Sequence, residues 1–411
     1  MFPCNQGIPG ENGIAHRTKF RKAKDKKETV MRRILISLKN FDPPLGGAEL
    51  SMRALAERLA EDHEVHVIFS GSRDDDYRKL GCNLHRRRVK NLLPGWLGRL
   101  HMDRRWKRLL DEALDRKPDL LLTQGSVSPG SVGKASELGC PNIVFLRSYE
   151  HFCPLLTQGG RDLANCKDRC LCCVPPRRYL DYPFFLLKRR LQRDSLSKAS
   201  LVLANSRFMK RVTEMRFSLN THVVNPFVKI SKYRTGKERG GEKIGMVNPM
   251  PHKGGEIVVE LAKRMGGRDF LVVGKGPPRT VEMMKRLPNV EYSSWVEDMR
   301  EVYEKVKLVL VPSLWQEPFC RVVVESISNG VPCIVSDRGA LPEVVGGGGS
   351  VVEKPESVDE WKKKIEEMDD KVLYKEKSEK AKRRSKKFSF ESSYEDFKDK
   401  VRGNLGISLG G

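Results

Sequence analysis

Two glutamates and one lysine carry the chemistry that this sequence suggests. Glu317 follows an apolar run at 308–311, and Glu325 lies within a segment whose apolar spacing predicts a helix closed by Gly330. Lys253 precedes two glycines at the predicted start of another helix. A helix N-terminus and a nearby lysine both favour a bound anion such as phosphate. Either glutamate alone would more often be a helix cap or a solvated side chain, so their common register with Lys253 carries the inference.

Parallel strands are expected to position these side chains. A second apolar run at 332–336 follows the helix, which predicts a strand, loop, helix and strand in succession. Ligands of sheets built this way bind outside the carboxyl ends of the strands, where the loop with Glu317 would lie. Similar runs separated by helical stretches predict a doubly wound α/β architecture, with further strands at 32–38, 64–69, 119–123, 142–147, 200–204, 221–224, 243–247 and 270–273.

The stretch 308–345 resembles the E-x7-E signature of the retaining GT-B glycosyltransferases, group 1 and family 4-like. The resemblance rests on the two glutamates, the preceding PS pair, the GVPCIVSD run and the GALPEV segment. It implies the GT-B fold, in which two Rossmann-like domains face each other across a cleft and a C-terminal helix crosses back to the first domain. It also implies a nucleotide sugar as donor, with no cofactor needed for catalysis.

Site roles follow from this resemblance, residue by residue. In the family the first glutamate meets the donor sugar, the second meets the ribose, and the amides between them hold the diphosphate. Catalytic roles are therefore implied for Glu317, Lys253 and Arg147. Donor contacts are implied for Gly46, Gly47, Gly274, Pro318, Phe319, Arg321, Val322 and Glu325. The family's phosphate-binding arginine has no clear match, and Phe319 and Cys320 in place of a usual glycine pair predict a tighter sugar subsite.

Arg147 stands where relatives with a similar segment carry a histidine, six residues before the first of several cysteines. We expect Arg147 to contact the charge of the donor in place of that histidine. The cysteine spacing would let four thiolates bind zinc or an iron–sulfur cluster, and the candidate ligands are Cys153, Cys166, Cys170 and Cys173. Free thiols are the alternative.

Composition shifts divide the chain. Residues 1–30 are basic without apolar periodicity and are expected to be disordered; Met31 could be the natural start, and a tail that binds membrane or nucleic acid is the alternative. We expect an N-terminal acceptor domain at 31–228 with a cysteine-rich insert at 150–175, and a linker at 229–242. A nucleotide-sugar-binding domain at 243–388 and a crossing helix and tail at 389–411 complete the prediction.

The net charge limits the classes of binding partner but does not select one of them. The chain has 77 basic and 53 acidic residues, a net charge of +24, which favours polyanions, anionic membranes or charged substrates. Basic stretches with interleaved Trp, Phe and Leu at 84–110 and 182–193 fit an anionic membrane surface, a nucleic-acid surface or a plain helix with core-facing Trp. No run suits a transmembrane helix or signal peptide, so a cytoplasmic protein is expected, peripheral at the inner face of the membrane.

The sequence thus predicts a transferase that moves a hexose from a UDP- or GDP-sugar to a lipid-linked or polysaccharide acceptor, with retention of configuration. Three departures from the family pattern support an alternative function. They are Arg147, Phe319 and the lack of a match for the phosphate-binding arginine. In this alternative a GT-B scaffold has lost catalysis and binds anionic membrane or nucleic acid, of which nucleic acid is the less expected partner. A GT-B epimerase or phosphorylase is a third possibility.

Overall fold

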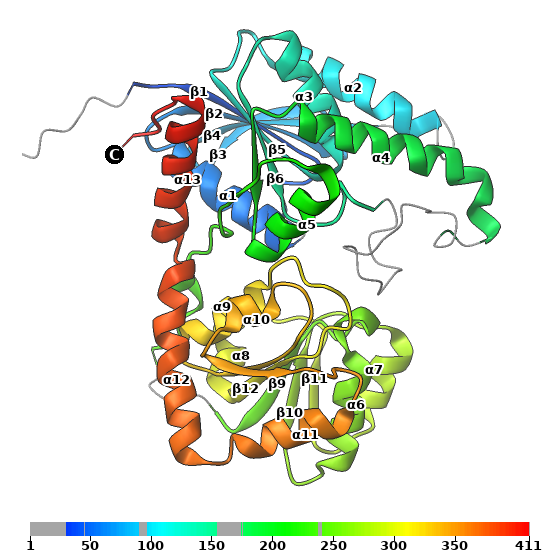
Figure 1. The fold of residues 1–411 in the computed structure, drawn as a ribbon, viewed down its shortest axis with the longest axis vertical. Coiled ribbons are helices and arrows are strands. Elements are labelled where there is room, and N and C mark those ends of the chain that lie inside the picture. The colour runs from blue at the N-terminus through cyan, green and yellow to red at the C-terminus, as the bar shows by residue number, and fades with distance from the viewer. Residues whose placement is uncertain are drawn as a thin grey trace, which may run out of the picture.

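Two α/β domains lie one above the other in the computed structural model, and two C-terminal helices run along one side of both (Figure 1). The structure describes residues 30–44, 46–89, 97–153, 174, 176–236 and 241–410. Both predicted Rossmann-like domains and the crossing helix are present, so the fold prediction is confirmed. Within the described residues, no helix is both long and apolar enough to cross a membrane.

The first domain is built on one sheet with the strand order β3-β4-β2-β1-β5-β6-β7-β8, parallel except for β3. Its strands are β1 (Arg33–Leu38), β2 (Glu64–Gly71), β3 (Asp75–Lys79), β4 (Cys82–Arg88), β5 (Leu120–Gln124), β6 (Asn142–Leu146), β7 (Leu201–Ala204) and β8 (His222–Val223). Its helices are α1 (Gly47–Leu59), α2 (Leu97–Ala113), α3 (Ser128–Glu137), α4 (Tyr182–Ser197) and α5 (Arg207–Phe217). The strand order reverses between β1 and β5, and such reversals are where α/β sheets bind ligands.

The second domain has a parallel sheet with the order β11-β10-β9-β12-β13-β14, which reverses between β9 and β12. Its strands are β9 (Lys243–Val247), β10 (Phe270–Val273), β11 (Val290–Ser293), β12 (Val306–Val311), β13 (Cys333–Ser336) and β14 (Gly349–Val352). The helices that cover it are α6 (Gly255–Arg264), α7 (Pro278–Lys285), α8 (Met299–Lys305), α9 (Arg321–Ser328), α10 (Leu341–Val345), α11 (Val358–Glu367) and α12 (Lys371–Ser385). The helix predicted between the apolar runs at 308–311 and 332–336 is α9, which lies between β12 and β13.

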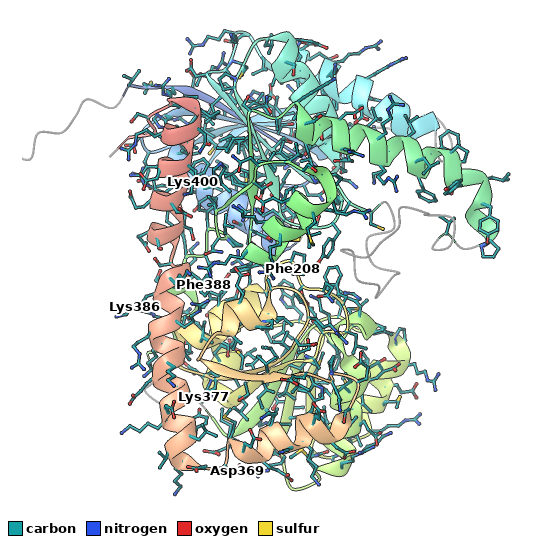
Figure 2. All side chains as sticks on the ribbon, viewed as in Figure 1. Phe208, Asp369, Lys377, Lys386, Phe388 and Lys400 are labelled. Atoms are coloured by element: carbon teal, nitrogen blue, oxygen red, sulfur yellow. The ribbon has the colours of Figure 1, made fainter. Side chains whose placement is uncertain are left out.

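The last helix, α13 (Phe390–Leu405), returns to the first domain. Its buried side chains Phe390, Tyr394, Phe397 and Val401 join the core formed by β1, β2, β5 and α1. The preceding helix α12 packs on α9 of the second domain. The C-terminal segment therefore contacts both domains, with Lys377 on α12 and Lys400 on α13 along the same side of the molecule (Figure 2).

The basic stretch at 84–110 is not one amphipathic segment. Its start belongs to β4, and its later part lies in α2. Trp106 on α2 is 2% exposed and donates a hydrogen bond to Ser37 Oγ at 2.8 Å. Phe185 in the second basic stretch is 1% exposed. The core-facing alternative therefore holds for both aromatic side chains, which are not available to a membrane surface.

Candidate active site

Lys253 and Glu317 meet where the second sheet reverses its strand order. Lys253 follows β9, Glu317 follows β12, and their Nζ and Oε1 atoms are 2.5 Å apart. Ser313 Oγ and Trp315 Nε1 donate to the same oxygen of Glu317 at 2.5 and 2.9 Å. The Lys253 ammonium also lies 5.0 Å from the ring centroid of Trp315. A carboxylate with 3% exposure is thus held by three donors at the expected ligand-binding edge.

Two glycines allow the loops around this pair to approach closely. Gly254, next to Lys253, has φ +79°, and a Cβ there would lie 2.1 Å from the carbonyl oxygen of Pro312. Gly339 has φ +65°, and a Cβ there would lie 2.3 Å from the backbone oxygen of Glu317. Any other residue would displace the lysine or the glutamate, because both positions combine a left-handed backbone with no room for a side chain.

Glu325 lies on α9, buried beneath its first turn. The side-chain oxygens accept hydrogen bonds from Tyr303 Oη at 3.0 Å and from Arg321 Nε at 3.4 Å. Burial raises the pKa of the Glu325 carboxyl, and Arg321 and Tyr303 oppose the rise. Cys320 at the helix N-cap accepts no side-chain hydrogen bond from the first turn. The backbone N–H groups at the start of α9, including those of Arg321 and Val322, are therefore positioned for an anion beside two carboxylates.

Arg321 connects α9 to the first domain. Its guanidinium donates to the carbonyl oxygen of Gly47 at 3.3 Å and to Tyr233 Oη at 2.9 Å. Gly47 follows Gly46 at the N-terminus of α1, where no side chain caps the helix. The glycine loop predicted to approach the donor is thus placed directly against α9.

Arg147 places a buried guanidinium at the same junction. All three of its nitrogen atoms are buried, and none has a hydrogen-bond partner among the described residues. The group lies 4.9 Å from the ring centroid of Phe145 and 5.5 Å from that of Phe227. Burial and the neighbouring Arg321 lower the pKa of Arg147 to about 9. A buried cation beside a second cation is costly unless an anion binds, so this geometry favours an anionic ligand here.

The two domains also touch directly around Glu317. Tyr149 Oη, from the segment after β6, donates to the carbonyl oxygen of Gln316 at 2.6 Å, and its ring centroid is 5.7 Å from that of Trp315. Ser206 Oγ, before α5, donates to the carbonyl oxygen of Pro318 at 2.7 Å. The loop with Glu317 is therefore held by side chains of the first domain as well as by its own domain.

Phe319 does not have the expected effect on the site. Its side chain is 5% exposed and packs in the core of the second domain, with its ring centroid 5.7 Å from that of Phe388. A side chain placed in the core does not narrow a sugar subsite. The prediction of a tighter subsite from Phe319 is therefore wrong, because this aromatic position faces the packing surface between α9 and the C-terminal helices.

Models of two glycosyltransferase domains match the chain. The model described as Glycosyltransferase Family 4 matches residues 45–232, and the model described as Glycosyl transferases group 1 matches residues 242–370. Together they cover both α/β domains and most of the sequence. The chain is therefore a glycosyltransferase built from these two domains.

Several solved structures share the fold of this chain. Sucrose-phosphate synthase from Thermosynechococcus elongatus is 15% identical, with a TM-score of 0.70 over 92% of this chain and 100% of that one. HepE from Anabaena in complex with UDP-glucose is 17% identical (TM-score 0.64; 90% and 100% covered). WaaG, a glycosyltransferase involved in lipopolysaccharide biosynthesis, is 16% identical (TM-score 0.65; 90% and 100% covered).

A curated relative aligns over a shorter stretch. Spore coat protein SA of Bacillus subtilis (strain 168) is 31% identical over 74 residues, which are 18% of this chain and 20% of the relative. The match thus spans about a fifth of the relative's length.

A pocket of about 530 Å³ lies in the second domain of the glycosyltransferase, beside Gly274. Lys275, Gly276, Tyr292 and Ser293 line this pocket, and Tyr292 Oη donates to the carbonyl oxygen of Gly274 at 2.9 Å. The predicted second-domain glycine loop therefore borders an open pocket at the carboxyl ends of β10 and β11.

The predicted metal site falls mostly outside the described residues. Cys153 is half-buried and packs against Val174 and Phe185. The other three candidate ligands, Cys166, Cys170 and Cys173, lie outside the described residues. In the part of the chain that the structure describes, no group of His, Cys, Asp and Glu side chains could hold a metal ion. The cysteine site stays a prediction.

Sequence reasoning missed several residues of the site. Trp315, Tyr303 and Tyr149 contact the glutamates or their loop, although none was singled out from the sequence. The one available signal was the position of Trp315, two residues before Glu317. Tyr303 and Tyr149 come from other elements, so only the fold brings them to the site.

Proposed function

We propose that this glycosyltransferase moves a hexose from a UDP- or GDP-sugar to a lipid-linked or polysaccharide acceptor, with retention of configuration. The observation that carries the proposal is the pairing of Lys253 with Glu317 at the sheet reversal, next to the N-terminus of α9 and Glu325. A similar fold binds UDP-glucose in HepE, which supports a nucleotide sugar as donor.

Stabilising the departing diphosphate is the largest demand of the reaction. Lys253, Arg147 and the N–H groups at the start of α9 supply positive charge and hydrogen-bond donors for it. Glu317 keeps the hydrogen bonds from Ser313 and Trp315 when Lys253 turns toward a phosphate, so its carboxylate is not left buried without a partner. Arg147, at the position of the relatives' histidine, contributes its charge from the first domain and compensates for the unmatched family arginine.

Glu317 is proposed to orient the donor sugar and to stabilise positive charge at the anomeric carbon. Its Oε1 atom already accepts three hydrogen bonds, which suits a fixed electrostatic partner better than an attacking nucleophile. Glu325 is proposed to accept hydrogen bonds from the ribose hydroxyls. The long 3.4 Å contact with Arg321 Nε is the one that those hydroxyls would replace.

The test is a titration with UDP, GDP and ADP, followed by turnover of the matching sugar donors. We expect one nucleotide to bind saturably and Glu325→Ala to weaken its binding. Proton NMR of the product from an α-linked donor should show an α-linkage. Absence of nucleotide binding together with tight, steeply salt-dependent RNA binding would favour the scaffold without catalysis. A β-linked product would contradict retention.

A further inference from the structure

The chain crosses from one domain to the other twice, and the two crossings lie side by side. The first contains the short helix Ile230–Tyr233, and the second is the turn Lys386–Phe388 between α12 and α13 (Figure 2). A parallel bridge between Val228 and Ser389 joins the two crossings. A change in the angle between the domains must bend both segments, so together they form the hinge of the molecule.

A groove of about 390 Å³ lies on this hinge, and residues of both crossings line it. Lys229 and Arg234 come from the first crossing, and Lys386 comes from the second. Glu391, in the first turn of α13, is the one acidic side chain among the described residues that line the groove. Three cations and one carboxylate give this lining a net charge of +2, which attracts anions.

Two of the three cations in the groove have no acidic partner. Lys229 Nζ donates to Glu57 Oε2 of α1 at 2.7 Å, whereas Arg234 and Lys386 form no ion pair within the part of the chain that the structure describes. Both side chains are exposed, so water solvates them when no ligand is bound. Like charges on two separate segments repel each other, and an anion that bridges them removes this repulsion.

Lys229 connects this groove to the donor side of the molecule. It also lines a second groove, of about 250 Å³, that extends to Arg321. Tyr233 Oη, in the first crossing, accepts a hydrogen bond from Arg321 Nη2 at 2.9 Å, and Arg321 Nε donates to Glu325 at 3.4 Å. A ligand that fixes the first crossing therefore also fixes Tyr233 and, through Arg321, the glutamate proposed to bind the ribose.

The size and charge of the hinge groove select its ligand. A volume of about 390 Å³ suits a small molecule and is too small for a nucleic-acid duplex. Arginine and lysine bind phosphate groups through charge-assisted hydrogen bonds. A small ligand with two phosphate groups therefore matches the groove, because it offers one group to Arg234 on the first crossing and one to Lys386 on the second.

We propose that the hinge groove binds a small ligand with two phosphate groups through Arg234 and Lys386, and that this ligand raises the affinity of the donor site for its nucleotide. In the structure the domains are in contact, since Tyr149 and Ser206 of the first domain donate hydrogen bonds to the loop of Glu317. The groove is complete in this arrangement, so its ligand stabilises the state in which the donor site is assembled. The effect on the donor site rests on the proposed function, whereas the binding site in the groove does not.

The experiment titrates pyrophosphate into the whole chain by isothermal calorimetry at low ionic strength. Pyrophosphate also resembles the leaving diphosphate, so we expect two sites, of which Lys253→Ala weakens one. Arg234→Ala combined with Lys386→Ala should weaken the other by about tenfold, because each exposed charge contributes a few fold. Lys375→Ala combined with Arg383→Ala is the matched control, since it removes the same two charges from exposed positions of α12. Equal pyrophosphate binding by the wild type and the hinge double variant overturns the site.

Nucleotide affinity in the presence of pyrophosphate tests the effect on the donor site. Competition at the donor site is common to the wild type and the hinge double variant, so the difference between them reports the hinge alone. We expect UDP or GDP to bind at least about fivefold more tightly to the wild type under these conditions. Equal nucleotide affinities overturn the coupling. Pyrophosphate binding at the hinge without any nucleotide binding would leave the groove standing as a site and would overturn the proposed donor.

Discussion

At the scale of single residues, Lys253 is the side chain on which the proposed chemistry depends most. Its ammonium pairs with Glu317 without a ligand, and it is proposed to neutralise the leaving diphosphate during transfer. We predict that Lys253→Ala lowers kcat by about 10²–10³, the range for removing one preorganised group that stabilises the transition state. Steady-state release of the nucleoside diphosphate measures this effect.

The control for this prediction is Lys263→Ala. Lys263 lies on α6, and its half-exposed side chain pairs with Glu260 on the same helix, far along the chain from the glutamates. Its removal should leave turnover within about twofold, since exposed ion pairs contribute little. Equal turnover in both variants would remove Lys253 from the proposed mechanism.

At the scale of elements, apolar buried strands were predictable and a strand rich in basic residues was not. The run that forms β12 is apolar and β-branched and has the composition of a buried strand. In β4, by contrast, Cys82 and Leu84 face the core while Arg87 pairs with Asp76 of β3, and the basic side chains hid the strand alternation. Strand prediction depends on alternating apolar and polar side chains, and the charged residues of β4 made this alternation hard to recognise.

The candidate site also contains residues that the sequence predicted and residues that it did not. The register of Lys253, Glu317 and Glu325 along predicted elements was enough to place them together at one sheet edge. The contacts of Tyr149 with the loop of Glu317 join segments far apart in the sequence, so no local pattern could reveal them. Long-range partners depend on how the two domains meet, and the sequence carries no periodic signal for that.

The crossing helix α13 yields a prediction about stability. Phe397 is fully buried in the core of the first domain, with ring contacts to Phe145 and Phe227. We predict that Phe397→Ala lowers the free energy of unfolding by about 3–5 kcal/mol, the usual cost of truncating a buried aromatic side chain. Urea unfolding measures the change, and Asp399→Ala on the exposed face of the same helix should cost less than about 0.5 kcal/mol. A small effect of the Phe397 change would mean that α13 does not stabilise the first domain.

At the scale of the whole molecule, the N-terminus of α5 couples the two domains. Ser206 Oγ accepts a hydrogen bond from Met209 N as the helix cap and donates one to the carbonyl oxygen of Pro318. Glu343 of the second domain accepts from the backbone N–H groups of Arg207 and Phe208, and Phe208 lies where the two domains meet (Figure 2). One helix end of the first domain thus fixes the loop next to Glu317.

Ser206→Ala tests this coupling against Ser357→Ala, which removes the cap of α11 and has no described contact with the first domain. Both changes should lower the free energy of unfolding by about 1 kcal/mol, as expected for loss of a serine cap. Only Ser206→Ala should also lower kcat/KM, by about two- to tenfold, because Pro318 loses the hydrogen bond that holds it beside Glu317. Thermal unfolding and donor kinetics on both variants separate the two effects. Equal kcat/KM in the two variants would show that the hydrogen bond from Ser206 to Pro318 does not hold the loop, and the coupling would then have to come from Tyr149 and Arg321.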